Sequence, residues 1–598
     1  EISACLVGSE MCIRDSALGR ASSVPKEPKR SDCVPRARAG ETTPMPDVCI
    51  VGMGAAGSTA AYVLGQAGLR VLVLEAGHAI DSRDSRPDEL YAAYARGGHG
   101  PKFNKELQTW RPNANAEVTT AQYSLGKMAN GVGGGTQIYG TWMRRYQHHD
   151  FAVRSGTVGR YGEGYLPLGS AIADWPITYD DLEPYYTRVE RMMGLAGIAG
   201  NVRGVPVPDG NPFEPYRSEP LPLPPTRRAP TGALFTEAAR RLGYHPYPVP
   251  VSVNSEPFDG RPVCTYCSWC TFYVCHNDSK STAGNTFARK ALAMGTVELR
   301  THCRVVAINA ERDGTVTSID YVDPEGVIVR QRARTFILAG YTFENVRLLL
   351  VSRSAAFPNG LGNSRGQVGK YFMTKMYQTV LGLFPGVRLN RFVGAGHQGT
   401  IMDDFVGDNF DHGGLGFIRG ATISCEEQLQ PIGASRMPLP PGVPAWGAAY
   451  KRHLIENWNS IADTRIQPET LPYDDTFLDL DPRVRDISGL GLPVVRITWD
   501  IHENEHRMMG YLETKVRAIL REMGAAQAWA GPRFTGAGSA HDLGGCRMGT
   551  DPATSVVDPS LRVHDSPNLY VMSGAVFPSG GGINPTLTLQ ALTWRACE

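Results

Sequence analysis

The clearest pattern of apolar and polar positions lies near the start of the chain, between residues 47 and 77. Four apolar residues, Val48–Val51, predict a buried parallel strand, because strands covered on both faces read as unbroken apolar runs. Small residues then lead into an amphipathic helix at Ser58–Gln66, and a second apolar run follows at Val71–Leu74. This order predicts a strand, a helix and a parallel strand in one α/β unit.

The turn between the first strand and the helix is the glycine-rich segment GMGAAG at 52–57. Gly52 permits the tight turn, Gly54 lets the backbone approach a pyrophosphate, and Gly57 lets the helix pack closely on the strand. Unpaired N–H groups at the helix N-terminus attract the phosphates. Glu75 ends the second strand and is predicted to accept hydrogen bonds from ribose hydroxyls. These features together predict a bound dinucleotide.

Later apolar segments divide the rest of the chain. Phe336–Gly340 is another apolar strand that ends at a glycine, so the dinucleotide domain is expected to be discontinuous. From Tyr377 to Trp499 aromatic, proline-rich and alternating segments favour a separate domain that contains a sheet, and a helix at His502–Met523 is predicted to return the chain to the first domain. The predicted fold is α/β: a Rossmann-type FAD-binding domain at 45–375 and 501–598, and a substrate-binding domain with a largely antiparallel sheet at 376–500.

Length and charge limit the possible functions. The chain has 598 residues, which is too long for one hydrophobic core, and its net charge of +1 gives no indication of a nucleic-acid partner. No apolar run approaches the length of a membrane span. Residues 1–44 lack apolar periodicity and a convincing signal peptide, so we expect a disordered or artefactual leader before Met45. The final residues, TWRACE, stop inside a predicted helix that has no cap, as in a fragment.

A cysteine run forms the second informative stretch. Four of the 12 cysteines, Cys264, Cys267, Cys270 and Cys275, follow the spacing C-x2-C-x2-C-x4-C. Zinc sites more often use two ligand pairs separated by a longer loop, whereas a compact run that starts C-x2-C-x2-C is closer to an iron–sulfur segment. The last gap is longer than in the ferredoxin pattern and no proline follows. Zinc, disulfides and free thiols therefore stay open as alternatives to a cluster.

The last hundred residues combine two further motifs, HDLGGCRMG at 541–549 and GGGINPT at 580–586. Judged from the residues alone, His541 is a lone histidine in a glycine-flanked loop, and such histidines are more often structural than catalytic. Together with the fingerprint, the GVGGGT turn at 131–136 and the WPITYDDLEPYY segment at 175–186, these motifs resemble the glucose–methanol–choline (GMC) oxidoreductases, FAD enzymes that oxidise alcohols. The resemblance covers most of the chain from Met45, with the motifs in the family's order.

The resemblance assigns roles to particular residues. It implies that His541 is the general base that takes the alcohol proton and that Asn584 orients the substrate oxygen. A histidine suits this task because its ordinary pKa lies near working pH, while the FAD cofactor does the hydride chemistry. The resemblance also implies FAD contacts at Gly133, Gly134, Thr136, Val305, Gly574 and Thr586.

The cysteine run resembles the branch of the family that includes the flavoprotein subunit of gluconate 2-dehydrogenase and the sorbose, fructose and glucose dehydrogenases. This resemblance implies a [3Fe–4S] cluster near the flavin, held by three of the four cysteines. It also implies a periplasmic enzyme that works with a small export subunit and with a cytochrome c subunit that attaches the complex to the membrane. Two positions depart from the family pattern: Tyr139 stands where many members have an asparagine, and Ser573-Gly574 replaces an acid-containing segment.

The leading functional hypothesis is therefore an FAD-dependent dehydrogenase of a sugar, sugar acid or polyol that passes electrons to a cytochrome or quinone. One alternative is an oxidase that reduces oxygen, for which the cysteine run would have no use. A second is a lyase that binds FAD without net redox chemistry. A third is an electron-transfer or scaffold flavoprotein without a substrate of its own, against which the paired His541 and Asn584 motifs argue.

Overall fold

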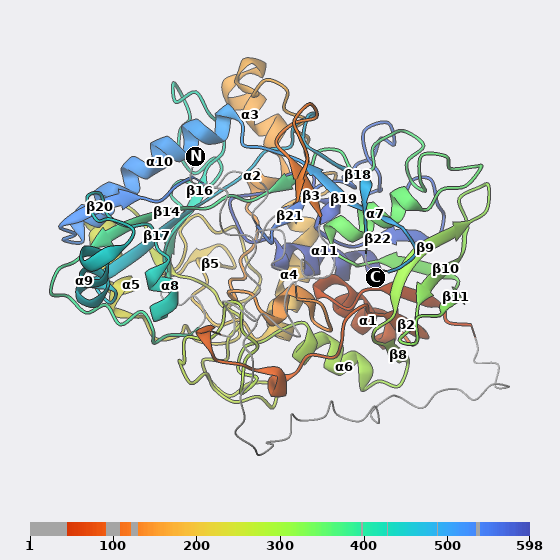
Figure 1. Cartoon of the computed structure of the whole chain (residues 1–598), viewed down its shortest axis with the longest axis horizontal. Helices are drawn as coiled ribbons and strands as arrows, with labels where there is room; N and C mark the ends of the chain where they lie inside the picture. Colours follow the sequence, from red (N-terminus) through yellow and green to blue (C-terminus); the bar gives the residue numbers. More distant parts are fainter. Residues whose placement is uncertain are drawn as a thin grey trace, which may run out of the picture. The chain divides into compact units, whose positions relative to one another are not determined.

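A five-stranded parallel sheet carries the dinucleotide motif. Its strand order is β22–β12–β1–β2–β8, and every neighbouring pair is parallel. The strands are β1 (Val48–Val51), β2 (Val71–Leu74), β8 (Val297–Arg300), β12 (Thr335–Leu338) and β22 (Leu569–Val571). All residues of β1 and β2 are buried, as a sheet covered on both faces requires. The helix α1 (Ala55–Gln66) follows β1 directly, and β1 pairs in parallel with β2, which confirms the predicted βαβ unit. Figure 1 shows α1 next to β2.

The computed structural model describes residues 45–90, 108–120, 129–395, 399–426, 428–486, 488–533 and 539–598. The predicted leader at 1–44 lies outside the described residues. Residues Pro46–Glu598 form one compact unit.

An antiparallel sheet and a helix extend the hydrophobic core that surrounds the parallel sheet. The sheet contains β9 (Arg304–Ala310), β10 (Val316–Val322) and β11 (Ile328–Arg332), and it leads the chain back into β12. The helix α7 (Thr342–Val351) starts directly after β12. Strands from the beginning, middle and end of the chain thus meet in one parallel sheet, and the predicted discontinuity of this part of the fold is confirmed.

A second, six-stranded sheet has the order β20–β14–β17–β16–β15–β7, and all its pairings are antiparallel. Its strands are β7 (Tyr247–Pro248), β14 (Gln378–Leu383), β15 (Thr400–Met402), β16 (Ala421–Glu426), β17 (Ile461–Pro468) and β20 (Gln527–Ala530). The helices α5 (Pro230–Arg241) and α10 (Glu503–Glu522) pack on it around a core of their own. The predicted fold class, a Rossmann-type part and a part with an antiparallel sheet, is confirmed.

The sheets do not follow the predicted division of the chain at 376 and 500. The strands β18 (Phe477–Arg485) and β19 (Pro493–Thr498) pair with each other and, through β19, with β3 (Thr109–Arg111), which pairs with β4 (Thr119–Thr120). Buried side chains of β18 and β19 belong to the same core as β1, whereas α10 and β20 belong with the second sheet. Alternation of apolar residues identifies a strand but does not specify which sheet it joins.

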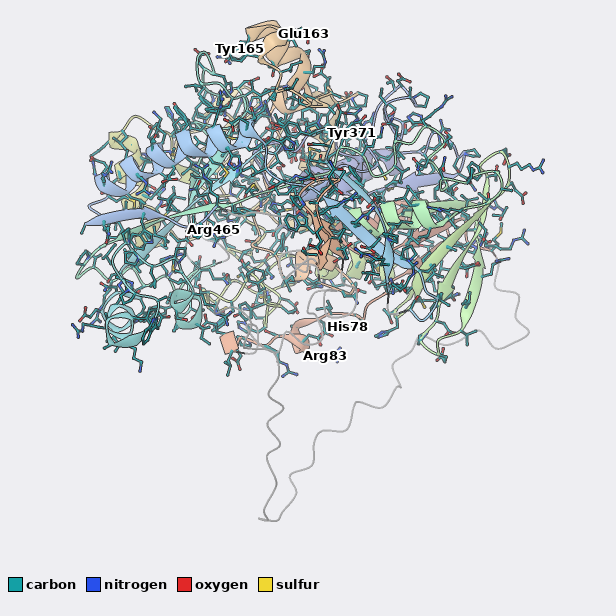
Figure 2. All side chains as sticks on the ribbon, turned by 45° about the horizontal axis from the view of Figure 1, so that its top comes forward. His78, Arg83, Glu163, Tyr165, Tyr371 and Arg465 are labelled. Carbon is teal, nitrogen blue, oxygen red and sulfur yellow. The ribbon has the colours of Figure 1, made fainter. Side chains whose placement is uncertain are left out.

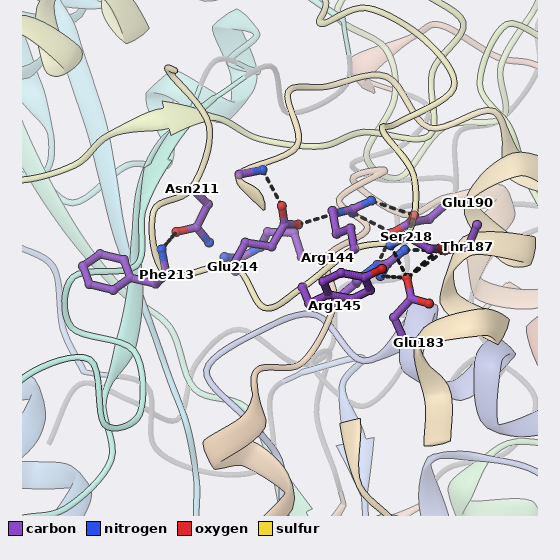
Figure 3. Close-up of polar contacts among 12 residues, drawn as sticks. Arg144, Arg145, Glu183, Thr187, Glu190, Asn211, Phe213, Glu214 and Ser218 are labelled. Atoms are coloured by element: carbon purple, nitrogen blue, oxygen red, sulfur yellow. Dashed lines mark hydrogen bonds and ion pairs between the residues drawn. The ribbon is translucent and has the colours of Figure 1, made fainter. Parts of the chain in front are cut away.

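A buried ion network fixes the segment that follows the second glycine turn. Arg145 contacts Glu183 at 2.9 Å and Glu190 at 2.8 Å, and both acids lie on α4 (Tyr179–Met193). Arg217 also contacts Glu190, at 2.8 Å. Figure 3 shows Arg145 together with Glu183 and Glu190. Removal of one partner from such a buried pair typically costs about 3–5 kcal/mol, because a charge is left without compensation. Thr178 caps α4, since its side chain accepts from the Asp181 backbone N–H.

Candidate active site

A cavity of about 1050 Å³ opens where β1, β2 and β12 end. Ligands in open α/β folds bind at this edge, outside the carboxyl ends of the parallel strands. Most of the predicted site residues line this one cavity although they are far apart in the sequence. They are Gly52, Gly54, Glu75, Gly134, Thr136, Val305, His541, Gly574, Asn584 and Thr586.

The first glycine turn has the geometry that its sequence predicts. Gly52 has a φ of +92°, and a Cβ there would lie 2.8 Å from the Ala339 carbonyl oxygen. A Cβ on Gly57 would lie 1.9 Å from the Gly52 carbonyl oxygen, so only glycine lets α1 pack this closely. A Cβ on Gly54 would meet its nearest atom at 3.9 Å, in space at the cavity wall. The backbone there is open to the close approach of a phosphate.

The carboxylate of Glu75 is fixed between two backbone donors. The Met53 N–H donates to it at 2.7 Å and the Gly77 N–H at 2.8 Å. The side chain is only 7% exposed, yet it lines the cavity. Because a carboxylate has about four acceptor positions, Glu75 retains capacity to accept from further donors such as ribose hydroxyls.

The second glycine turn faces the first one. A Cβ on Gly134 would lie 2.9 Å from Cα of Gly54, so the two backbones meet at the cavity wall. Gly133 has a φ of +89° and caps the short helix Gly134–Gln137, but it is not among the described residues that line the cavity. Tyr139 does line the cavity, and its hydroxyl donates to the Ser281 carbonyl at 2.7 Å. This contact accommodates the tyrosine at the position where family members commonly have asparagine.

These features fit FAD. Two glycine turns form a cradle that side chains would fill, a helix N-terminus faces it, and a buried carboxylate lies where the ribose is expected. Val305 and Thr586, two further predicted cofactor contacts, line the same cavity.

His541 and Asn584 meet in this cavity. Nδ2 of Asn584 lies 3.3 Å from Nε2 of His541, although the residues are 43 positions apart. His541 precedes the short strand β21 (Asp542–Leu543), and Asn584 precedes α11 (Thr586–Cys597). The N–H of Gly544 donates to the Gly574 carbonyl at 3.0 Å, which ties the histidine segment to the turn that replaces the family's acidic segment. The two residues with the most specific motifs thus share one site.

Sequence analysis missed two residues that contact this pair. The Tyr377 hydroxyl lies 2.8 Å from Nδ1 of His541, and Nε2 of Gln467 lies 3.4 Å from Oδ1 of Asn584. Tyr377 immediately precedes β14 and Gln467 lies in β17, which are neighbours in the second sheet. No motif marks either residue, because their position follows from the pairing of two distant strands.

Lys375 is a third residue that the sequence did not indicate. Its ammonium donates to the Gly581 carbonyl at 2.7 Å and to the Ile583 carbonyl, directly before Asn584. Burial lowers the pKa of Lys375 to about 7, against the opposing effect of the nearby Glu469 carboxylate. Lys375 is only 1% exposed, and its two hydrogen bonds hold the loop that precedes Asn584.

Cationic side chains line the cavity on the side of the second sheet. They are Arg436, Arg465 and Arg533. Arg465, labelled in Figure 2, lies on β17 opposite Thr379 of β14. These positions are two residues along the chain from Gln467 and Tyr377, respectively. Its Nη2 also lies 3.5 Å from the Asp463 carboxylate. This wall is therefore suited to an anionic or strongly polar substrate group.

The cysteine run forms a loop beside the cavity. Thr271 and Phe272, within the run, line the cavity, and the Phe272 N–H donates to the Ile138 carbonyl at 2.7 Å. Burial raises the pKa of Cys264 to about 11 and that of Cys270 to about 12. None of the four cysteines, all of which the structure describes, forms a disulfide. Among the described residues no three His, Cys, Asp or Glu side chains are placed to hold a metal ion, so the run does not form a ready-made metal site.

Comparison with known proteins identifies the family. A profile described as GMC oxidoreductase matches residues 477–593, which include His541 and Asn584, and one described as an NAD(P)-binding Rossmann-like domain matches residues 50–116. The gluconate 2-dehydrogenase flavoprotein of Pantoea cypripedii is 32% identical over 92% of each chain. The chain belongs to the GMC oxidoreductase family. It is an FAD-dependent oxidoreductase that acts on CH–OH groups.

Other relatives of this GMC oxidoreductase carry different names. The fructose dehydrogenase large subunit of Gluconobacter japonicus is 29% identical over 92% of this chain and 97% of its own, and the paromamine 6'-oxidase of Streptomyces fradiae is 30% identical over 92% and 90%. Among solved structures, the formate oxidase of Aspergillus oryzae RIB40 is similar in fold, with a TM-score of 0.59, 13% identity and coverage of 92% and 97%. No helix in the described part of the chain has the length and apolar character needed to cross a membrane.

Proposed function

We propose that this GMC oxidoreductase is a dehydrogenase that oxidises an alcohol group of a sugar, sugar acid or polyol. The observation that carries the proposal is the His541–Asn584 pair, with Nε2 and Nδ2 3.3 Å apart in the cavity that the two glycine turns also line. A base and a hydrogen-bond donor beside a cofactor cradle match the needs of alcohol oxidation.

The proposed reaction removes a proton and a hydride from the substrate. The alcohol O–H donates to Nε2 of His541, which takes the proton, while Nδ2 of Asn584 donates to the alcohol oxygen and fixes its position. The hydride that leaves the carbinol carbon would be taken up by FAD, which the residues of the cradle would hold, and the alcohol would thereby become a carbonyl group. Correct positioning of the substrate oxygen contributes to the rate because misplaced reactants rarely reach a reactive geometry.

Within the three substrate classes, the cationic wall favours a sugar acid. Arg465 and Arg533 line the same cavity as His541, and a guanidinium can bind a carboxylate through two parallel hydrogen bonds. The name of the Pantoea cypripedii relative, a gluconate 2-dehydrogenase flavoprotein, points to the same class.

We further propose that electrons leave the reduced cofactor through the cysteine run toward a cytochrome or quinone. Support comes from the position of this loop, since Thr271 and Phe272 bring it to the cavity wall. A [3Fe–4S] cluster would need three of the four cysteines to reorient and lose their thiol protons as iron binds. The family branch supports a periplasmic location and two partners, a small export subunit and a cytochrome c subunit.

One experiment tests the dehydrogenase proposal. The FAD-loaded protein is mixed without oxygen with a hydroxy acid such as gluconate, a matched polyol such as sorbitol, and glucose, while flavin absorbance is followed. Bleaching of the flavin by at least one of these substrates is expected, and fastest with the acid. The reduced enzyme is then given either an artificial electron acceptor or oxygen. Rapid peroxide formation would favour the oxidase alternative, and the absence of bleaching by any of these compounds would favour a lyase.

A further inference from the structure

The contacts of His541 form a chain with a defined direction. Gln467, Asn584, His541 and Tyr377, which we name the His541 relay, are joined by three contacts of 3.4, 3.3 and 2.8 Å. We propose that Gln467 and Tyr377 are positioning residues that hold His541 as a neutral base with its lone pair on Nε2. This inference rests on the proposed role of His541 and adds two residues that no motif indicates.

The orientation of the Asn584 amide sets the direction of the relay. Nε2 of Gln467 donates to Oδ1 of Asn584, which places the acceptor end of the Asn584 amide on the Gln467 side. Nδ2 of Asn584 then faces Nε2 of His541. Because an amide nitrogen is a donor only, Nε2 of the histidine must present a lone pair.

The histidine hydrogen must consequently lie on the other ring nitrogen. A neutral imidazole that accepts at Nε2 carries its hydrogen on Nδ1, which donates to the hydroxyl oxygen of Tyr377 at 2.8 Å. The other neutral tautomer, and the imidazolium, would turn an N–H of His541 toward the N–H of Asn584. Two facing donors repel each other, so the relay favours the one tautomer that can act as a base at Nε2.

This arrangement is complementary to an alcohol. A hydroxyl group that enters between the two side chains can donate to Nε2 of His541 and accept from Nδ2 of Asn584 at the same time. A carbonyl group, the product, can only accept, so it loses the contact with Nε2 once His541 has released the proton and is neutral again. The relay therefore distinguishes the two redox forms of the substrate by their hydrogen bonding.

The pairing of β14 with β17 in the second sheet brings two residues of the relay together. The antiparallel pairing joins Gln378 of β14 to Ile466 of β17, which places the adjacent residues Tyr377 and Gln467 side by side. Gln467 is only 2% exposed. A site on paired strands is held more rigidly than one on loops, and this rigidity is what tautomer control requires.

Several other titratable or charged groups also line the cavity. They are Tyr341, Lys375, Arg436, Arg465, Arg533 and Asp542. Lys375 donates to backbone carbonyls and Tyr341 donates to Asp542 at 2.5 Å, so these contacts differ from those of the relay. Neither of these contacts involves Gln467 or Tyr377. Substitutions at those two positions therefore leave both contacts in place and test the relay alone.

The test compares Gln467→Glu, Gln467→Met and Tyr377→Phe, each loaded with FAD, over a range of pH. When ionised, the glutamate at position 467 can only accept hydrogen bonds. The Asn584 amide is therefore expected to turn and to present Oδ1 to Nε2 of His541. Nε2 then carries a hydrogen and cannot act as the base. We expect kcat to fall roughly tenfold or more, a part of the effect of a general base, with a smaller change in KM. The acid limb of the kcat/KM profile should move to higher pH by about one unit.

The two neutral variants distinguish the effect of lost hydrogen bonds in the relay from the effect of an added negative charge. Gln467→Met and Tyr377→Phe should each lower kcat by less than Gln467→Glu does and should move the acid limb little, because no charge is added. Tyr161→Phe, whose hydroxyl contacts Asp411 outside the cavity, is the matched tyrosine control and should retain full activity. FAD content, measured by absorbance, confirms that each variant is folded.

The outcomes distinguish the relay from the role of the base itself. If His541→Ala is inactive but the Gln467 and Tyr377 variants keep the kcat and pH profile of the unaltered enzyme, the relay is wrong while His541 remains the base. If His541→Ala keeps its turnover, the proposed function of His541 fails, whatever the relay variants show. A lower kcat in Tyr377→Phe together with a shifted profile in Gln467→Glu supports the relay.

Discussion

The ammonium group of Lys375 donates to the Gly581 carbonyl at 2.7 Å, from inside the protein and three residues before Asn584. The backbone around Gly581 includes a φ of +56°, a conformation that needs support from its surroundings. Lys375 thus acts on the substrate site through the backbone of the Asn584 loop, although its own side chain is almost fully buried.

We expect Lys375→Met to lower kcat by roughly ten- to a hundredfold while FAD stays bound. The change leaves the carbonyls of Gly581 and Ile583 without their buried donor, so the loop shifts and Asn584 is misplaced. Steady-state kinetics with the preferred substrate would measure this effect. A variant with unaltered kcat would show that the loop holds its position without the lysine.

The pH dependence of the free energy of unfolding should reveal the lowered pKa of Lys375. Burial lowers the pKa of Lys375 from 10.5 to about 7, so between these values the unfolded chain binds more protons than the folded one. The free energy of unfolding contributed by this group therefore rises as pH increases through this window. Lys375→Met should remove that rise. Denaturant unfolding at pH 7 and pH 9 for both proteins measures the difference, and parallel behaviour of the two would contradict the assignment.

His541→Ala should reduce turnover by roughly a hundredfold or more, the size expected for loss of a general base. FAD binding should be unaffected, because the histidine lies at the Asn584 end of the cavity whereas the predicted phosphate and ribose contacts come from the glycine turns and Glu75. Single-turnover flavin reduction, followed without oxygen, isolates this step from later electron transfer. Full activity of the variant would remove His541 from the mechanism.

The sequence predicted those parts of the fold and the site that depend on local pattern. The strand at Val48–Val51, the glycine turn and Glu75 lie within thirty residues, and their spacing has one structural solution in a βαβ unit. The contacts of Tyr377 and Gln467 depend on the pairing of β14 with β17, whose sequence separation leaves no local signal. For the same reason β18 and β19 were assigned to the second domain, whereas their side chains complete the first core.

Glu75→Gln should weaken FAD binding by about tenfold or more. A neutral amide can accept from only one of the two backbone N–H groups that now bind the carboxylate, and hydrogen bonds to charged groups are worth about 1.5–3 kcal/mol each. Titration of the FAD-free protein with FAD gives the dissociation constant. Glu75 contacts the Met53 and Gly77 N–H groups, whereas His541 contacts Asn584 and Tyr377. We therefore expect kcat at saturating FAD to change little, and a large loss of kcat would point to a wider disturbance.

Arg465→Gln should raise the KM for a hydroxy acid by about tenfold and change the KM for the matched polyol much less. The reason is that the guanidinium can form charge-assisted hydrogen bonds only with the acid. The comparison of gluconate with sorbitol in both proteins provides the measurement. An equal effect on the two substrates would show that Arg465 shapes the cavity without recognising a carboxylate.

Cys270→Ser tests the proposed electron path. If the run holds an iron–sulfur cluster, the protein as isolated without oxygen should contain iron and acid-labile sulfide, and its EPR spectrum should show an oxidised three-iron cluster. The serine variant should lose that signal, keep normal reduction of FAD by substrate, and pass electrons to a cytochrome more slowly. Cys425→Ser, a buried cysteine of β16 outside the run, is the matched control and should keep the iron. A folded, FAD-containing protein without iron would make the four cysteines structural and would favour the oxidase alternative. If Cys270→Ser slows reduction of FAD by substrate as much as it slows electron transfer to the cytochrome, the run supports the cavity wall at Thr271 and Phe272.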